Sequence, residues 1–208
     1  MKILVLGATG GTGMEIVRQA IERKHAVTVL VRAPEKLGVL RAQIITKQGN
    51  LLSTEDLEEA LRGQDAVLSA FGPRVPIAKH EEHLLGQFST ALVSAMQRAH
   101  VKRILVESSA FLFRDALFPP AYLLGKMLFP TVVRDATAME TNIQSTQLDW
   151  TILRPPRLTD GALSRRYRVC LGKLPALGFS ISRADVADYF LRAVEDDSTI
   201  RKVVGLSN

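Results

Sequence analysis

The chain contains few cysteines and few aromatic residues. Its 208 residues include one cysteine, Cys170, and aromatic side chains make up 6% of the total. A single cysteine excludes an intramolecular disulfide and is compatible with a reducing compartment. The hydrophobic fraction of 47% supports a substantial core, and the length is typical of one domain.

Long runs of one residue class are also missing. No apolar run reaches the length of a membrane span. The first apolar segment begins almost at Met1, so we expect no signal peptide. The 27 basic and 21 acidic residues give a net charge of +6, but the basic residues are spread along the chain. Such a surface suits anionic cofactors and substrates, and no nucleic-acid-binding motif is recognisable. We therefore expect a cytoplasmic monomer or homodimer that binds small molecules, without a nucleic-acid or membrane partner.

The first third of the chain contains its most informative pattern. Residues 2–6 form a short apolar run, residues 7–13 are rich in glycine, residues 14–23 have helical periodicity, and residues 26–31 form a second apolar run. This order predicts a strand, a tight turn, a helix and a second strand. In that context a glycine pattern indicates a dinucleotide-binding turn.

Three glycines have separate expected roles in this turn. Gly7 allows the strand to turn sharply, Gly10 lets a pyrophosphate approach the backbone, and Gly13 lets the helix pack closely on the strand. The free N–H groups of the helix start then face the phosphates. The other loop residues expected at the cofactor are Thr9, Gly11 and Thr12. The alternative is a glycine-rich turn without a ligand.

The glycine spacing is Gly-x-x-Gly-x-x-Gly rather than Gly-x-Gly-x-x-Gly. It resembles the short-chain dehydrogenase/reductase superfamily in its extended and atypical branches, which carry this spacing at the N-terminus. The resemblance implies a nicotinamide cofactor bound to a Rossmann fold.

Arg32, at the end of the second predicted strand, decides which cofactor we expect. An NAD site usually has an acidic residue there, which binds the ribose 2′-hydroxyl, whereas a guanidinium fits a 2′-phosphate. No acid lies between His25 and Pro34 to repel that phosphate, and Lys36 is a possible second contact. We therefore predict NADPH (NADP) as the cofactor; the alternative is an ordinary solvated arginine.

The remaining pattern alternates strands and helices. Further strands are predicted at residues 43–46, 66–70, 103–109, 148–153 and 202–206, and helices from Ser53 or Thr54, at 81–99, at 131–145 and at 182–194. We predict an α/β, doubly wound (Rossmann) parallel sheet with strand order 3-2-1-4-5-6-7 and helices on both faces. Residues 1–208 would form one domain, in which residues 155–180, with a short strand near 165–170, contribute a small C-terminal substrate lobe.

Other cofactor contacts are expected where strands end. The resemblance places Asn50 and Leu51 against the adenine, where the family often has an Asp followed by an apolar residue. Ala70, Phe71 and Gly72 follow the fourth predicted strand, across the crevice from the glycine loop.

Two serines end the fifth predicted strand. In the resembled superfamily a serine at this place faces the nicotinamide and the substrate carbonyl, so Ser109 is the candidate catalytic residue and Ser108 a candidate cofactor contact. The alternative is a pair of serines that cap a strand. After the sixth strand, Pro155 and Pro156 fix an extended loop beside the nicotinamide.

Tyr122 and Lys126 match the superfamily's Tyr-x-x-x-Lys pair, in which the lysine lowers the pKa of the phenol. Two features oppose this role. Pro130 interrupts the helix that would carry the pair onward, and residues 131–145, with Glu140, are the better match for the family's long helix. We therefore predict that Tyr122 is not the essential proton donor.

Two other segments leave alternatives open. Residues 110–133 are strongly apolar but broken by prolines, which fits a lid over a substrate, an interface or a buried excursion. His80 and His83 stand near a helix start at a spacing that can bind metal, but nothing completes a site, so we predict no metal.

Residues 149–155, Asp-Trp-Thr-Ile-Leu-Arg-Pro, resemble a segment of atypical reductases, including NmrA-like proteins and the biliverdin-IXβ/flavin reductase group. Residues 109–111 and 181–187 extend this resemblance. It implies an NADPH-dependent oxidoreductase that transfers hydride to a planar acceptor such as a flavin, quinone or bilin. The alternatives are a non-catalytic NADP(H)-binding redox sensor of the NmrA-like type and a sugar-nucleotide epimerase, for which the chain is short.

Overall fold

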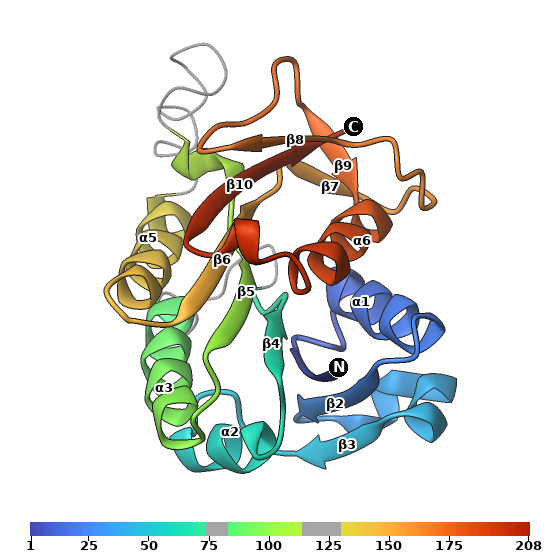
Figure 1. The fold of residues 1–208 in the computed structure, drawn as a ribbon, viewed down its shortest axis with the longest axis vertical. Helices are drawn as coiled ribbons and strands as arrows, with labels where there is room; N and C mark the ends of the chain where they lie inside the picture. Colours follow the sequence, from blue (N-terminus) through green and yellow to red (C-terminus); the bar gives the residue numbers. More distant parts are fainter. Residues whose placement is uncertain (74–82, 114–129) are drawn as a thin grey trace.

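The computed structural model describes residues 1–73, 83–113 and 130–208 (Figure 1). Its centre is an eight-stranded sheet in the order β3-β2-β1-β4-β5-β6-β10-β8. All neighbouring strands pair in parallel except β10 and β8, which are antiparallel. The strands of this sheet are β1 (Lys2–Leu6), β2 (Ala26–Val31), β3 (Ile45–Gln48), β4 (Ala66–Ser69), β5 (Arg103–Glu107), β6 (Asp149–Arg154), β8 (Arg168–Leu171) and β10 (Lys202–Ser207).

The predicted Rossmann fold and the predicted order of seven strands are confirmed, with β10 in the seventh position. The antiparallel edge strand β8 adds an eighth. Strands β7 (Arg157–Thr159) and β9 (Ser180–Ser182) form a separate two-stranded parallel sheet, so three short strands arise from residues 155–182. That this part receives substrate stays a prediction.

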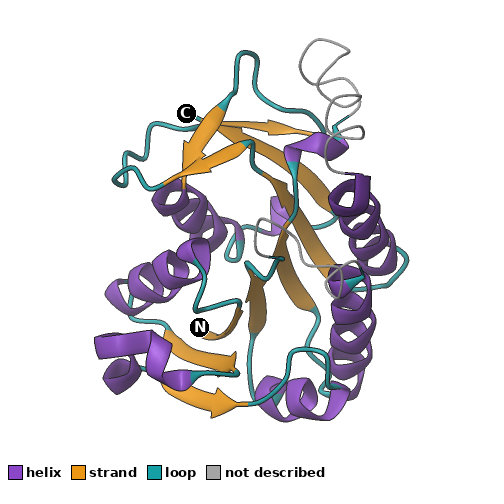
Figure 2. Cartoon of the chain, turned by 180° about the vertical axis from the view of Figure 1, so that it is seen from behind, coloured by secondary structure: helices purple, strands orange, loops and turns teal. Residues whose placement is uncertain are grey.

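Helices cover both faces of the sheet (Figures 1 and 2). On one face α1 (Gly11–Glu22) packs beside α6 (Arg183–Ala193), and on the other α2 (Thr54–Leu61), α3 (Leu84–Arg98) and α5 (Pro130–Gln144) lie in a row. Each layer buries its own apolar cluster against the sheet. The short 3₁₀ helices are η1 (Pro34–Gln43), η3 (Ala110–Leu112) and η4 (Asp197–Thr199).

Helix ends follow the capping chemistry of the sequence. Of the two predicted starts of α2, Ser53 is the cap and accepts a hydrogen bond from the Asp56 N–H, and Ser182 caps α6 in the same way. Pro130 occupies the first position of α5, where a missing N–H costs nothing. The third strand lies two residues later than predicted, because η1 extends to Gln43.

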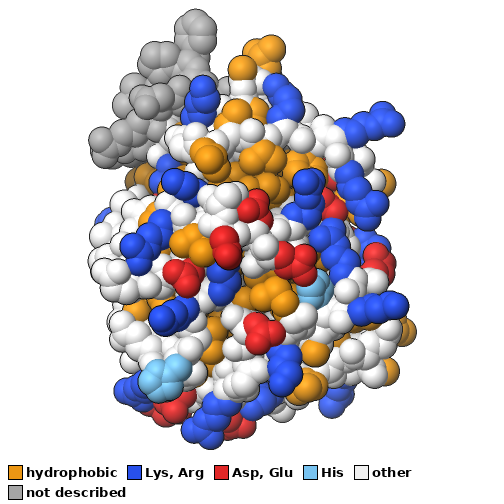
Figure 3. Space-filling model, viewed as in Figure 1, with side chains coloured by type: hydrophobic (Ala, Val, Ile, Leu, Met, Phe, Trp, Pro, Cys, Tyr) orange, Lys and Arg blue, Asp and Glu red, His pale blue; other side chains and the backbone are white. Residues whose placement is uncertain are grey.

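One face of the molecule carries charges of both signs. On the face shown in Figure 3, Lys and Arg side chains alternate with acidic and apolar ones instead of forming one basic patch. Within the described ranges, no helix has both the length and the apolar character needed to cross a bilayer.

Arg103 links the end of α6 to the centre of the sheet. Only 8% of this residue is exposed. Its guanidinium donates to the carbonyl oxygens of Ala193 and Asp149 and to the hydroxyls of Thr151 and Thr199, at 2.5 to 2.8 Å. A cation at the carboxyl end of a helix is also favoured by the helix dipole. A buried charge therefore satisfies carbonyls that would otherwise lack donors.

We expect Arg103→Met to lower the free energy of unfolding by about 3 kcal/mol, because several buried acceptors lose a charged donor together. Urea denaturation followed by circular dichroism measures the change. Arg98→Met, at a side chain that is 55% exposed, is the matched control and should change stability by less than about 0.5 kcal/mol. Equal losses in the two variants would contradict the role of Arg103.

Candidate functional site

The carboxyl ends of the parallel strands meet at one edge of the sheet. Leu6 lies opposite both Leu30 and Ser69, and Glu107 lies opposite Leu153. Strand β1 stands between β2 and β4, where strand order reverses, and ligands of such sheets bind at this crevice. The segments that leave this edge contain most of the predicted site residues, namely Gly7, Thr9, Gly10, Gly11, Thr12, Gly13, Arg32, Ala70, Phe71, Gly72, Ser108, Ser109 and Pro155.

Two glycines are required by the turn itself. Gly7 has φ +78°, and a Cβ on it would lie 2.6 Å from the carbonyl carbon and oxygen of Ala70. A Cβ on Gly13 would lie 2.1 Å from the carbonyl oxygen of Gly7. The sharp turn and the close helix–strand packing predicted for these positions are therefore present. The loop rests directly on the chain that leaves β4.

Gly10 has a different environment. A Cβ built on it would come no nearer than 3.3 Å to the Gly7 carbonyl oxygen, and its φ of −88° is open to any residue. The contact with the Gly7 carbonyl oxygen would be tight, but folding constrains position 10 far less than positions 7 and 13. An open backbone at this point leaves room for a phosphate, which is the role predicted for Gly10.

The start of α1 has unused donors. Gly10 is the N-cap residue, has no side chain to cap the helix, and no acid lies in the first turn. The N–H groups of Gly11, Thr12 and Gly13 have no acceptor within the part of the chain that the structure describes. Three free N–H groups at the positive end of a helix dipole fit a pyrophosphate.

Thr12 and Glu107 form a contact that sequence reasoning missed. Thr12 is 5% exposed, and its hydroxyl donates to Glu107 Oε1 at 3.5 Å. Burial of the carboxyl raises the pKa of Glu107 to about 7, although the Thr12 hydrogen bond and the charge of Arg183 oppose this rise. The sequence signal was an acid directly after the apolar residues 104–106. A titratable carboxyl thus lies beside the glycine loop.

Ser108 is held by a buried ion pair. Its hydroxyl donates to Glu140 Oε1, and Arg154 donates to both oxygens of the same carboxylate. The Arg154 guanidinium also lies 4.8 Å from the centre of the Phe113 ring and donates to the Leu112 carbonyl oxygen. Glu140 and Arg154, which were not predicted as site residues, therefore fix the end of β5 against α5 and β6.

Ser109 has a freer hydroxyl. Its Oγ accepts from the Phe111 N–H at 3.3 Å, which caps η3, and its hydroxyl proton has no acceptor among the described residues. The following backbone is fixed, because the Ala110 N–H donates to the Pro155 carbonyl oxygen at 3.0 Å. Of the two serines, Ser109 is the one with a donor available to a ligand.

Comparison with known proteins decides the family. Residues 7–197 match the family model described as NAD(P)H-binding. The chain belongs to this NAD(P)H-binding family. The predicted resemblance to atypical short-chain dehydrogenases/reductases is confirmed, and the glycine loop described above lies at the start of the matched region.

Relatives of this NAD(P)H-binding chain differ in length. YwnB of Bacillus subtilis (strain 168) is 32% identical over 211 residues, which cover 94% of this chain and 92% of YwnB. The photosystem II assembly factor Ycf39 of Synechocystis sp. is 30% identical over 214 residues, 97% of this chain but 61% of Ycf39. The chain thus spans about three fifths of that relative. The anaerobilin reductase ChuY of Escherichia coli O157:H7 shares the fold with a TM-score of 0.81 and 21% identity, over 100% of this chain and 97% of ChuY.

Residues predicted at the adenine end of the NAD(P)H site lie on and after β2 and β3. Arg32 and Lys36 are exposed, and neither side chain has a hydrogen bond or ion pair within the described ranges. Asn50 is exposed, but its Oδ1 already accepts from the Leu52 N–H at 3.1 Å. Leu51 is 8% exposed and packs in the core beneath α2 and α3, so its side chain contributes chiefly to that core.

Three residues discussed from the sequence, Tyr122, Lys126 and His80, lie outside the described residues. The structure does show that α5 begins at Pro130, so this proline starts the helix that carries Glu140. The predicted helix at 131–145 is confirmed within one residue at each end.

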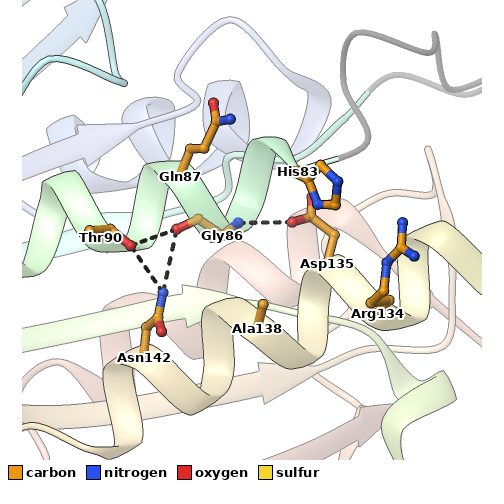
Figure 4. A pocket seen from close by; sticks show the side chains of 8 residues that line it. All are labelled: His83, Gly86, Gln87, Thr90, Arg134, Asp135, Ala138 and Asn142. Carbon is orange, nitrogen blue, oxygen red and sulfur yellow. Dashed lines mark hydrogen bonds between the residues drawn. The ribbon is translucent and has the colours of Figure 1, made fainter.

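A hollow of about 270 Å³ lies between α3 and α5 (Figure 4). Beside it the Asp135 carboxylate accepts from the Leu85 and Gly86 N–H groups at 2.8 and 2.9 Å, and so caps α3. Asn142 donates to Thr90 Oγ1 at 3.2 Å. These polar groups join the two helices, and none of the lining residues belongs to the glycine loop or a strand end.

The raised pKa of Glu107 predicts a pH-dependent stability. The unfolded chain loses this proton near pH 4.5, whereas the folded chain keeps it to about pH 7, so the contribution is complete below pH 4.5 and is lost as pH rises through 7. Glu107→Gln cannot ionise. We expect it to be more stable than the wild type by about 3 kcal/mol at pH 8.5, and nearly equal to it at pH 4.5.

Urea denaturation at both pH values measures this difference. Glu59→Gln, at a side chain that is 68% exposed, is the control and should follow the wild type. If Glu107→Gln had the same pH dependence as the wild type, the carboxyl would not be titrating in the folded protein near pH 7.

Proposed function

We propose that this chain is an NADPH-dependent reductase that transfers hydride to a planar acceptor such as a flavin, quinone or bilin. The choice of NADPH rests on the position and the free guanidinium of Arg32. This residue directly follows β2, beside the glycine loop, and its exposed guanidinium has no partner within the described ranges. A free guanidinium at this place suits a 2′-phosphate, and the absence of an acid from residue 26 to residue 33 removes the usual ligand of a 2′-hydroxyl.

The residues present fit the cofactor. Gly10 leaves the backbone open, and the N–H groups of Gly11, Thr12 and Gly13 are available to the pyrophosphate. When bound, NADPH would supply the hydride. Ser109 would donate its hydroxyl hydrogen bond to the nicotinamide amide or the acceptor, at the far side of the same edge from Arg32.

We propose a planar conjugated acceptor because its reduction does not require a proton donor from the protein. A flavin, quinone or bilin can take its proton from solvent after hydride transfer, so the reaction does not depend on a Tyr–Lys pair. Ser108 is engaged by Glu140 and is not available for acid chemistry. The shared fold with the anaerobilin reductase ChuY adds support for this acceptor class.

Cofactor choice gives the first test. We expect the wild type to bind NADPH at least tenfold more tightly than NADH, a difference of about 1.4 kcal/mol, and Arg32→Ala to remove most of that gap. Isothermal titration calorimetry gives both dissociation constants. Arg62→Ala, at a side chain 70% exposed that follows α2, is the control and should keep the preference. Equal affinities of the wild type for NADPH and NADH would contradict the NADPH assignment.

A second function is favoured by one comparison. Ycf39 is named as an assembly factor rather than as an enzyme, and it is 30% identical to this chain. A non-catalytic NADP(H)-binding sensor of the NmrA-like type would share the cofactor site but not turnover. NADPH oxidation, measured against a panel of flavins, quinones and bilins, separates the two: sustained turnover supports the reductase, and binding without turnover supports the sensor.

Once an acceptor has been identified, the kcat/KM values of variants show whether Ser109 or Tyr122 contributes to catalysis. We expect Ser109→Ala to lower kcat/KM by more than Tyr122→Phe does, and the latter to stay within about tenfold of the wild type, below the 10²–10⁴ typical of a lost general acid. Circular dichroism checks folding. A thousandfold loss in Tyr122→Phe, matched by Lys126→Ala, would instead identify a Ser–Tyr–Lys triad and a carbonyl reductase.

A further inference from the structure

Gly11 is a glycine that the three-glycine motif does not account for. A Cβ built on it would lie 2.6 Å from Cδ and 2.7 Å from Nε of Arg183, and 3.6 Å from its guanidinium carbon. The Arg183 side chain therefore occupies the space that a side chain at position 11 would take. A cation from residue 183 lies over the first residue of α1.

Rigid elements hold Arg183 in this place. It is the first residue of α6, whose N-terminus is capped by Ser182. Helix α6 packs beside α1, and Gln19 of α1 donates to the Ala184 carbonyl oxygen at 2.9 Å. The Arg183 side chain is 29% exposed. Its approach to the glycine loop thus follows from the packing of two helices rather than from a free surface side chain.

The guanidinium has donors to spare. Its Nη1 pairs with Asp160 Oδ1 at 2.5 Å, and that carboxylate is 90% exposed, so the pair is weak and exchangeable. Its other N–H groups have no acceptor within the described ranges. Gly11, over which the Arg183 side chain lies, is the first of the three residues with free N–H groups at the start of α1. The arrangement offers backbone and guanidinium donors to one anion.

We propose that Arg183 binds the pyrophosphate of the dinucleotide together with the N–H groups of Gly11 and Thr12, and that Gly11 has no side chain because Arg183 needs the space. The inference rests on the proposed function only in requiring a dinucleotide. It does not depend on the 2′-phosphate, because NADH, NADPH and ADP all contain two linked phosphates. Arg32 and Arg183 then act on different phosphates.

Binding of three ligands tests the assignment without turnover. Calorimetry with NADPH, NADH and ADP is carried out on the wild type, Arg183→Ala, Arg183→Gln and Arg32→Ala. We expect both Arg183 variants to weaken all three ligands by about the same factor, on the order of tenfold. Arg32→Ala should weaken NADPH alone. Thermal melting without ligand checks that the variants fold.

Asp160→Asn distinguishes phosphate binding from a structural ion pair. If Arg183 serves only to pair with Asp160, Asp160→Asn and Arg183→Ala should weaken ligand binding by the same factor. If Arg183 binds pyrophosphate, Asp160→Asn removes a competing anion and affinity rises or stays level. Gly11→Ala should weaken binding in the wild type by displacing Arg183, and should have no further effect in the Arg183→Ala background.

Each failure has a separate reading. Wild-type affinities retained in both Arg183 variants would overturn this inference and leave the NADPH assignment intact. If the wild type bound NADPH and NADH equally well while Arg183→Ala weakened every ligand about tenfold, the NADPH assignment would be overturned and the role of Arg183 would stand. If the losses of binding free energy caused by Gly11→Ala and Arg183→Ala were additive, the claim that a side chain at position 11 displaces Arg183 would be refuted.

Discussion

The structure depends on a close backbone contact that only glycines permit. Gly13 brings the first turn of α1 against the Gly7 carbonyl, and Gly7 in turn lies on Ala70 where the chain leaves β4. This contact places the start of a helix, with its free N–H groups, at the point where strand order reverses. A methyl group on Gly13 would push α1 away from the Gly7 carbonyl, and one on Gly7 would push the loop away from the chain that leaves β4. The crevice is therefore a consequence of backbone packing before any side chain contributes to it.

Helix α6 organises the other side of the site through buried charges. Asp185 is fully buried and accepts hydrogen bonds from the Ser164 and Arg165 N–H groups at 2.9 and 2.8 Å, so it holds the loop before β8. Burial favours the neutral form of Asp185, but hydrogen bonds from the Asn208 amide, the Arg165 N–H and the hydroxyls of Ser164 and Ser182 outweigh it and keep the pKa of Asp185 low. Asp188 binds Arg23 of α1 on the next turn. One helix thus connects the first helix of the fold with the strands formed by residues 155–182.

Much of this fold was predictable from the sequence because its signals are local. Alternating strand and helix patterns predicted the seven-strand order, and Ser53 predicted the start of α2. Strand β8 was harder to place in the sheet, since Val169 and Leu171 are 40% and 56% exposed and give no buried periodicity. Leu51 is 8% exposed and packs in the core, which its sequence context did not reveal, and its contact with the adenine stays a prediction. Glu107 and Arg183 could not be predicted at the loop, because their neighbours Thr12 and Gly11 lie far away in the sequence.

If Arg32 and Arg183 act as proposed, the affinity for the cofactor and the selectivity between NADPH and NADH come from different parts of the chain. Arg32 belongs to the N-terminal strand–turn–helix–strand unit and would act only on the 2′-phosphate. Arg183 comes from the C-terminal helix and would act on the pyrophosphate that both nicotinamide cofactors share. The first turn of α1 contains no acid. The charged residues that the fold brings to the loop include Glu107 and Arg183, which are of opposite sign. The loop motif alone therefore identifies a nucleotide site, whereas its strength depends on residues that only the folded chain brings to it.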